Sequence, residues 1–353
     1  MDKTEFSGLV SRLVSGETVE RGEWKVLLSS LSLAEQELLA ERAREVSQKN
    51  FGNGVYVRGL VEISSFCKNN CYYCGLRCAN KGASRYRMSH EEILDCCALG
   101  DELGFNTFVL QGGEDLQQND AFIESLVAAI HVKYPSKAIT LSVGERSEQA
   151  YAAFRAAGAS RYLLRHETAS PQHYSHLHPA AMSCACRQDS LFVLKNLGYQ
   201  VGSGMMVGSP MQTVDNLVDD ILFLERLQPQ MIGIGPFIPA AGTPFEGEKQ
   251  GSAALTLLLL SLLRLRFPKA LIPATTALST ILPDGVERGV LAGANVVMPN
   301  LTPLSVRGKY TIYNNKKVSG SESAQQLDAL AARLAAIGYK IDYGRGDYPA
   351  DTQ

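Results

Sequence analysis

The chain has 353 residues and a formal net charge of −2 at pH 7, so its charge gives no reason to expect nucleic acid or an anionic membrane as a partner. Hydrophobic residues make up 45% of the sequence and charged residues 20%, as in globular proteins. The amino terminus lacks the order of a signal peptide, and the longest apolar run, 254–263, is too short to span a bilayer, so we expect a cytoplasmic protein without membrane contact.

Residues 1–54 are predicted to form a helical amino-terminal extension. Ser32 and Glu35 make a capping box that opens a helix running towards Lys49, and a Gly-Asn-Gly segment at 52–54 ends it. A second capping box, from Ser89 to Glu92, predicts a later helix that ends near Gly104.

Short β-rich segments then alternate with helical ones. The predicted strands are Val55–Ile63, Thr107–Gln111, Ile139–Val143, Arg161–Arg165, Gln200–Met206, Met231–Gly235, Ile272–Thr276 and Asn295–Met298. This alternation favours an α/β fold in which a (β/α)8 TIM barrel spans residues 55–315. Residues 316–353 are predicted to form a helical tail packed on the barrel.

Three cysteines follow the first predicted strand in a C-x3-C-x2-C spacing, namely Cys67, Cys71 and Cys74. Three neighbouring thiolates can bind three irons of a 4Fe-4S cluster and leave the fourth iron without a protein ligand. An open iron is a place for a substrate or cofactor to bind, so the loop points towards catalysis. An aromatic residue directly before the third cysteine, Tyr73, can pack on an adenine bound there.

A structural zinc site is the alternative interpretation of this loop, with Cys78 as the fourth thiolate. Four ligands within twelve residues would cross-link little of the chain, which favours the cluster. The remaining cysteines are grouped rather than spread like a disulfide framework. The roles of Cys78, Cys96, Cys97, Cys184 and Cys186 stay open, and no cysteine follows Cys186.

Other polar groups also stand at predicted strand ends, where barrel enzymes place their functional residues. In the turn Gly112-Gly113-Glu114, the two glycines allow the backbone to approach a ligand closely, and the carboxylate could bind an ammonium group. Arg165 is a candidate for binding a carboxylate, and Glu167 is a candidate for binding a ribose or an ammonium group. The histidines at 173, 176 and 178 are interpreted as the surface start of a helix, and no Ser-His-Asp arrangement is recognisable.

The cysteine loop and the Gly-Gly-Glu turn resemble those of the radical S-adenosylmethionine (SAM) superfamily. Further segments are similar to the HydE family of FeFe-hydrogenase maturases, including Tyr72–Arg77, Arg85–Met88, Arg161–Thr168, Gly233–Pro239, Ile272–Thr276 and Gly293–Asn300. The resemblance implies reductive cleavage of SAM to a 5′-deoxyadenosyl radical at one 4Fe-4S cluster. It further implies a role in H-cluster assembly on a cysteine-ligated iron carbonyl cyanide synthon, alongside other hydrogenase maturases and an electron donor such as ferredoxin or flavodoxin.

The same resemblance assigns roles to individual residues. The cluster ligands, and hence the catalytic residues, are Cys67, Cys71 and Cys74. The SAM-binding residues are Tyr73, Gly112, Gly113, Glu114, Ser142, Glu167, Arg187 and Met298. The substrate-facing residues are Arg165, Met231, Thr275, Thr276 and Tyr310.

Some relatives bind a second cluster through cysteines near the carboxyl terminus, and this chain has none there, so one cluster is expected. Three alternatives remain: a methylornithine synthase-like mutase, a biotin synthase, and a non-catalytic iron-sulfur or zinc scaffold. The Cys-Gly-Leu-Arg, His-Glu-Thr and Pro-Ala-Thr-Thr segments favour the maturase over the mutase. Biotin synthase is disfavoured because the other cysteines do not lie on the later strands.

Overall fold

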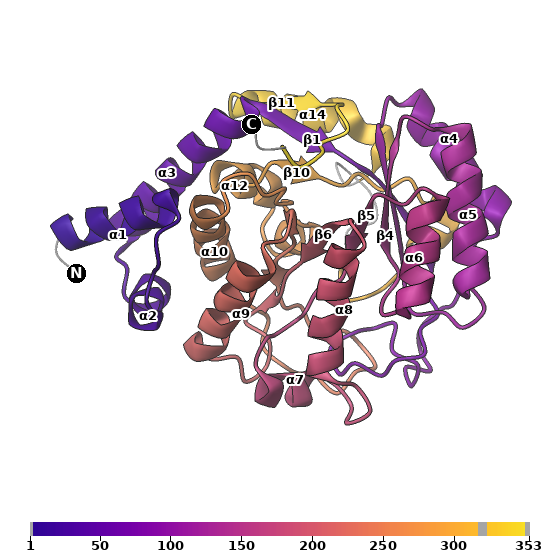
Figure 1. Cartoon of the computed structure of the whole chain (residues 1–353), viewed down its shortest axis with the longest axis horizontal. Coiled ribbons are helices and arrows are strands. Elements are labelled where there is room, and N and C mark those ends of the chain that lie inside the picture. The colour runs from indigo at the N-terminus through magenta and orange to yellow at the C-terminus, as the bar shows by residue number, and fades with distance from the viewer. Residues whose placement is uncertain (1–2, 317–322, 350–353) are drawn as a thin grey trace.

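Parallel strands surrounded by helices form the body of the molecule in a computed structural model that describes residues 3–316 and 323–349 (Figure 1). The strands are β1 Gly54–Val57, β2 Gly59–Ser64, β3 Thr107–Gly112, β4 Ala138–Ser142, β5 Arg161–Leu163, β6 Gln200–Ser203, β7 Met206–Val207, β8 Met231–Ile232, β9 Gly235–Pro236, β10 Val296–Val297 and β11 Lys340–Asp342.

The strands close on themselves. Six of them form a parallel sheet in the order β2-β3-β4-β5-β6-β8, and β10 pairs with β1, which leads directly into β2. Single parallel bridges, Met231 to Leu271 and Pro273 to Val296, join β8 to β10. The predicted α/β barrel is therefore confirmed.

Helices alternate with the strands on the outside of the barrel. They are α1 Lys3–Ser15, α2 Arg21–Ser29, α3 Leu33–Phe51, α4 His90–Glu102, α5 Asp120–Lys133, α6 Glu148–Ala157, α7 Pro171–Leu177, α8 Cys184–Asn196, α9 Val214–Leu227, α10 Ala253–Arg266, α11 Thr276–Ile281, α12 Gly285–Leu291, α13 Leu304–Arg307 and α14 Leu327–Ala336, with a 3₁₀ turn at Ala324–Gln326. Both predicted capping boxes are confirmed, since Ser32 and Ser89 accept from the backbone N–H three residues later.

Four predicted strand segments are divided or reduced in the structure. Val55–Ile63 is divided at Arg58 into β1 and β2, and Met231–Gly235 is divided between β8 and β9. The segment Ile272–Thr276 forms only single bridges, because Pro273 has no N–H to continue a ladder, and α11 already begins at Thr276. Gln200–Met206 is interrupted at Gly204, where the chain passes so close to Gly233 that a Cβ would lie 2.0 Å from its carbonyl oxygen. The strand resumes as β7, which pairs with β9.

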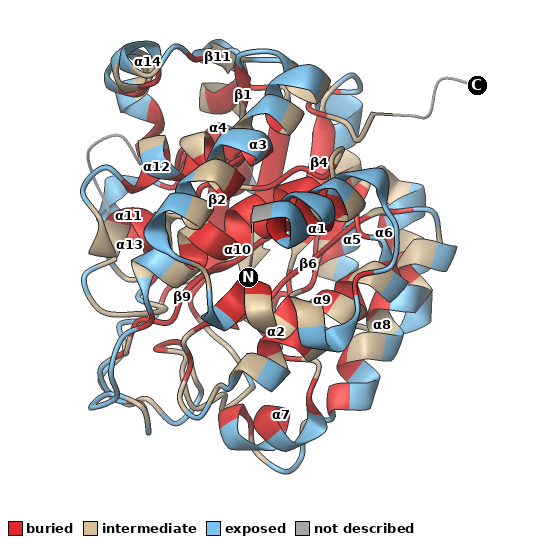
Figure 2. Cartoon of the chain, turned by 90° about the vertical axis from the view of Figure 1, so that its left-hand side faces the viewer, coloured by how far each residue is buried: buried red, intermediate tan, exposed pale blue. Residues whose placement is uncertain are grey.

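The amino-terminal helices pack on one side of the barrel. Figure 2 shows α10 as a largely buried helix behind α1 and α3, and α10 contacts both helices. Trp24 on α2 is fully buried in the same apolar cluster as α9 and α10. Burial of this apolar surface stabilises the docking of the extension.

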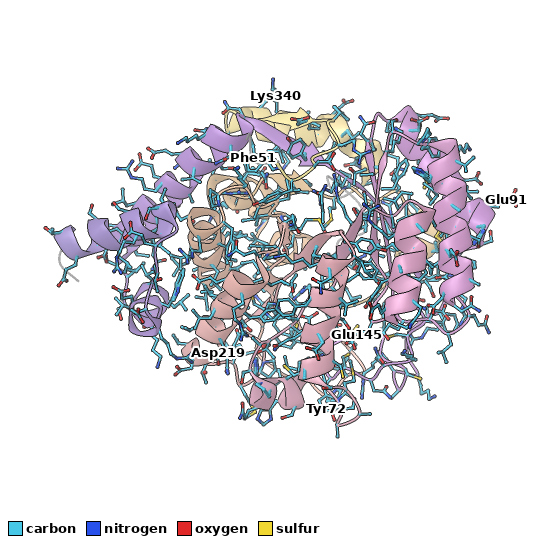
Figure 3. All side chains as sticks on the ribbon, in the orientation of Figure 1. Phe51, Tyr72, Glu91, Glu145, Asp219 and Lys340 are labelled. Carbon is cyan, nitrogen blue, oxygen red and sulfur yellow. The ribbon has the colours of Figure 1, made fainter. Side chains whose placement is uncertain are left out.

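The carboxyl-terminal segment covers the amino ends of the strands, which the sequence did not predict. Arg161 begins β5, and its guanidinium donates to the Arg345 carbonyl oxygen and pairs with Asp347 at 2.7 Å. Arg58, also buried, donates to the Gly346 carbonyl oxygen. Figure 3 shows Tyr72 of the cysteine loop and Lys340 at opposite ends of the molecule, so the open end of the barrel is the one with the cysteines. Among the described residues, no helix is long and apolar enough to cross a membrane.

Candidate active site

The cysteine loop leaves β2 at Ser64 and is fastened by three remote segments. The backbone N–H of Lys68 donates to the Glu114 carbonyl oxygen at 2.9 Å, Tyr72 donates to Leu177 at 2.9 Å, and Gly75 donates to Ile312 at 3.0 Å. Backbone hydrogen bonds of this kind hold an irregular loop in one conformation. The loop is therefore a fixed part of the barrel mouth.

The thiols of the loop are half-buried and free of disulfides. Burial raises the pKa of Cys67 and of Cys71, and it raises the pKa of Cys74 to about 12, with a further contribution from the neighbouring thiol of Cys67. The thiols are thus protonated at neutral pH until a metal displaces their protons. Within residues 3–316 and 323–349, no three His, Cys, Asp or Glu side chains converge on a single ion position.

A cavity of about 260 Å³ opens beside the loop and contains six of the predicted site residues. Its walls are Cys71, Tyr73, Cys74, Arg165, Glu167, Met206, Gly235, Pro236, Phe237, Ile238, Thr275, Ala277, Ile312 and Tyr313. Met206 and Phe237 form an apolar cluster with Tyr73. The predicted loop, the strand ends and Thr275 therefore meet in one place.

Arg165 and Glu167 follow β5 and face each other across 3.0 Å, from Nη2 to Oε2. Within the described chain, Nε of Arg165 has no hydrogen-bond partner, whereas its Nη2 and Oε2 of Glu167 have only each other as ion-pair partners. Thr275 Oγ1 also has no hydrogen-bond partner among the described residues. Buried polar atoms without partners are costly, and a polar ligand in the cavity would satisfy them.

The backbone of Glu167 is strained, with φ of 65°. A residue with a Cβ rarely adopts this left-handed conformation. Such strain persists only where the surrounding structure imposes it, and it is concentrated at functional sites.

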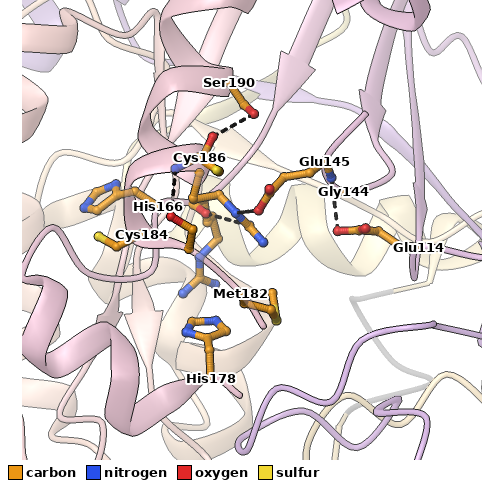
Figure 4. Close-up of polar contacts among 12 residues, drawn as sticks. Glu114, Gly144, Glu145, His166, His178, Met182, Cys184, Cys186 and Ser190 are labelled. Atoms are coloured by element: carbon orange, nitrogen blue, oxygen red, sulfur yellow. Dashed lines mark hydrogen bonds and ion pairs between the residues drawn. The ribbon is translucent and has the colours of Figure 1, made fainter. Parts of the chain in front are cut away.

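The Gly112-Gly113-Glu114 turn lies against the cysteine loop. A Cβ on Gly113 would be 2.3 Å from the Phe66 carbonyl oxygen and 2.7 Å from the Cβ of Cys67, so only glycine allows this approach. The Glu114 carboxylate accepts from the Glu145 N–H at 3.0 Å (Figure 4) and pairs with the half-exposed Lys68 ammonium at 3.1 Å. Glu114 belongs to a smaller adjoining cavity with Lys68.

Arg187 on α8 lies behind the cavity rather than in its wall. Its guanidinium pairs with the Glu145 carboxylate and donates from Nη1 to the Arg165 carbonyl oxygen at 3.0 Å. The buried positive charge is thereby compensated, as buried charges require, and it supports the backbone that carries Arg165.

The Tyr73 hydroxyl lies 3.2 Å from His178 Nε2. His178 Nδ1 is 3.1 Å from the Tyr174 carbonyl oxygen, which can only accept, so Nδ1 carries the proton and Nε2 accepts from Tyr73. Burial and Arg187 lower the pKa of His178 to about 3, which agrees with a neutral ring. The predicted helix start in this histidine tract is confirmed by α7, and His176 is exposed. The surface placement was wrong for His173 and His178, which are both buried.

Four further predicted residues lie outside the cavity wall. Met231 and Met298 share an apolar cluster with Leu271 and Val296. Ser142 ends β4 opposite Gln111, and Thr276 begins α11 next to Thr275.

Tyr310 also lies outside the wall, and its hydroxyl is 3.4 Å from Gln111 Nε2. Together with the residues above, the predicted set thus splits into six that line the cavity and others that surround or support it.

Comparison with known proteins decides the family. Residues 61–224 match the family model described as the radical SAM superfamily. The FeFe-hydrogenase maturase subunit HydE of Thermotoga maritima is 45% identical over 305 residues, which are 85% of this chain and 87% of that protein. The chain belongs to the radical SAM superfamily.

Methylornithine synthases and a second hydrogenase maturase show lower sequence identity to this chain. The 3-methylornithine synthase of Methanosarcina acetivorans is 31% identical over 81% of both chains. The crystal structure of methylornithine synthase (PylB) covers 95% of this chain and 97% of its own with a TM-score of 0.81 and 27% identity. The FeFe-hydrogenase maturase HydG from Carboxydothermus hydrogenoformans, at 21% identity and a TM-score of 0.81, covers 97% of this chain and 80% of its own and supports the fold alone.

As a radical SAM enzyme, the chain requires a 4Fe-4S cluster and SAM, and its residues fit both groups. Cys71 and Cys74 line the cavity, and Tyr73 lies between them in sequence. Polar atoms of Arg165, Glu167 and Thr275 line the same space. Loss of a thiol proton on metal binding is the expected chemistry of such a donor set.

The sequence alone missed the segment that covers this radical SAM site. Ile312 and Tyr313 wall the cavity, and three residues later the Lys316 ammonium pairs with Glu62 at 2.6 Å inside the barrel. The segment lies beyond the last predicted strand, and no motif marks it. The positive charge of Lys316 in a polar stretch gave the only signal, and it is ambiguous.

Proposed function

We propose that this radical SAM enzyme is a HydE-type maturase that acts in assembly of the H-cluster of FeFe-hydrogenase. The observation that carries the proposal is the 45% identity to HydE across 85% of the chain, compared with 31% to a methylornithine synthase over a similar length. When bound, the 4Fe-4S cluster supplies the electron that splits SAM into methionine and a 5′-deoxyadenosyl radical.

Binding of SAM is assigned to the groups that surround the cysteine loop. Glu114 pairs with Lys68, which is exposed enough to move away, so the carboxylate can exchange that ammonium for the one of SAM. Tyr73, held by His178, offers its ring to the adenine. Glu167 would bind a ribose hydroxyl or the amino group of SAM. Arg187 would balance the charge of the SAM carboxylate.

The remaining SAM assignments are supported by position only. Gly113 lies against Cys67 and Gly112 lies against Ser64. Ser142 ends β4 and Met298 follows β10.

The substrate is proposed to be a cysteine-ligated iron carbonyl cyanide synthon. Arg165 and Thr275 have unpartnered polar atoms in the cavity and would bind anionic or carbonyl groups. Thr276, Met231 and Tyr310 are proposed to lie farther along the substrate path. The apolar walls at Met206, Phe237 and Ile312 would exclude water from a reactive intermediate.

We propose a single cluster per chain, a one-electron donor such as ferredoxin or flavodoxin, and function in the cytoplasm next to the other hydrogenase maturases. The reducing environment keeps the cysteines available for iron. An iron count of about four per chain after reconstitution is the expected value for one cluster of this type.

The proposal is tested in two steps. Anaerobically reconstituted protein with SAM and dithionite should yield 5′-deoxyadenosine, and absence of this product would leave only the scaffold alternative. The same protein should restore hydrogenase activity to a maturation extract that lacks HydE. Formation of methylornithine from lysine, without restored hydrogenase activity, would instead identify the mutase.

A further inference from the structure

The strained residue Glu167 has contacts of its own and lies between two residues with contacts elsewhere. Its N–H donates to the Gly204 carbonyl oxygen at 3.1 Å, and its carboxylate pairs with Arg165 at 3.0 Å. His166 precedes it and Ala169 lies two residues after it. Both residues contact the carboxylate of Asp220 on α9.

His166 is fully buried. Nδ1 of its ring has a hydrogen-bond partner, whereas Nε2 only faces a carboxylate. Nδ1 lies 2.9 Å from Ser203 Oγ at the end of β6, and the His166 N–H donates to the same oxygen at 3.3 Å. Nε2 lies 3.4 Å from the Asp220 carboxylate. The ring also packs on Phe223, with centroids 4.8 Å apart, one helical turn from Asp220 on α9.

Asp220 contacts the chain on both sides of Glu167. Besides facing His166, its Oδ1 accepts from the Ala169 N–H at 2.5 Å. The side chains of His166 and Asp220 are both fully buried, and Ser203 is equally inaccessible. This Ser203-His166-Asp220 arrangement, which the sequence did not reveal, is closed to any substrate, so it is no hydrolytic triad.

We propose that Asp220 and His166 are positioning residues that fix the left-handed turn at Glu167 and thereby aim its carboxylate into the SAM cavity. The inference rests on the proposed binding role of Glu167. Burial of the Asp220 carboxylate costs free energy. The two residues that it contacts, His166 and Ala169, lie on either side of the strained Glu167. The adjacent Arg165 is supported separately through its carbonyl oxygen by Arg187.

The test is a double-mutant cycle on SAM affinity, measured by calorimetry on reconstituted protein with the cluster oxidised so that SAM is not cleaved. Glu167→Gln should weaken binding about 30-fold, as loss of a charge-assisted hydrogen bond does. Asp220→Asn should weaken it about fivefold by itself and less than about twofold in the Glu167→Gln background, because it acts through Glu167. Asp219→Asn, on the same helix but paired with Arg21 at the surface, is the matched control and should leave affinity unchanged.

Each outcome bears on the inference. Multiplicative losses in the double variant would overturn it, as would an Asp220→Asn variant with unchanged affinity. If the unmodified protein with a full cluster binds no SAM, the proposed function and this inference both fail. Should Asp220→Asn not fold, Ser203→Ala removes the other anchor of His166 and must show the same lack of additivity. A crystal structure of either variant should show residue 167 displaced from φ near 65°, without any need for the cluster.

Discussion

Replacing Lys316 by methionine leaves Glu62 as an unpaired carboxylate inside the barrel. The two groups are 2.6 Å apart, and their side chains are 7% and 0% exposed. Removing one partner of a buried ion pair costs about 3–5 kcal/mol, because the other charge stays buried without compensation. We expect the free energy of unfolding of Lys316→Met to fall by that amount at pH 8.

The loss should depend on pH in a defined direction. Burial raises the pKa of Glu62, and the Lys316 ammonium opposes that rise, so the variant has a still higher folded pKa. A carboxyl group that binds its proton more tightly in the folded state destabilises the fold as pH rises from its unfolded pKa to its folded pKa. The variant should therefore lose less stability at pH 5 than at pH 8, because Glu62 takes up a proton as the pH falls.

The assay is urea denaturation of the cluster-free protein at both pH values, followed by circular dichroism and by the fluorescence of Trp24. Glu62→Gln combined with Lys316→Met should regain at least half of the loss, because a neutral amide replaces the buried charge. Lys309→Met, on the same segment but only half-buried, should change stability by less than about 0.5 kcal/mol. A pH-independent loss, or one below about 1 kcal/mol, would refute the reasoning.

Three further variants test the site and the barrel base. Cys71→Ser should abolish 5′-deoxyadenosine formation and lower iron content, which iron analysis after reconstitution measures; full iron and activity would contradict the ligand assignment. Tyr73→Phe removes the hydroxyl that donates a hydrogen bond to His178 and should weaken SAM binding about fivefold in calorimetry. An unchanged affinity would show that this hydrogen bond does not orient the Tyr73 ring. Burial alone would raise the pKa of Asp347, but hydrogen bonds from Arg161 and Arg345 lower it to about 2. Asp347→Asn should therefore cost about 1 kcal/mol at pH 6, allowing for solvent screening. This cost should vanish as pH falls from about 4 towards 2, where the native carboxyl is protonated; a cost that persists in acid would point to packing instead.

The barrel was predictable from the sequence because its signals are local. Capping boxes at Ser32 and Ser89 marked helix starts, and short apolar segments marked strands. The errors arose where tertiary contacts override these patterns. Pro273 breaks a ladder that the β-rich composition of Ile272–Thr276 suggested, and the close approach of Gly204 to Gly233 divides one predicted strand into two.

The site was predictable only in part, for a related reason. Spacing within one loop identifies Cys67, Cys71 and Cys74, since their ligand role needs no information from the rest of the chain. Pairs such as Lys316 with Glu62 or His166 with Asp220 join residues that lie far apart in sequence. No spacing in the sequence connects the two partners of either pair, so only the folded structure reveals them.

The segments that fasten the cysteine loop also shape the cavity beside it. Gly75 is bonded to Ile312, which is itself a cavity wall, and Tyr72 is bonded to Leu177, whose neighbour His178 orients Tyr73. Loop position and cavity shape are therefore set by the same hydrogen bonds and cannot vary independently.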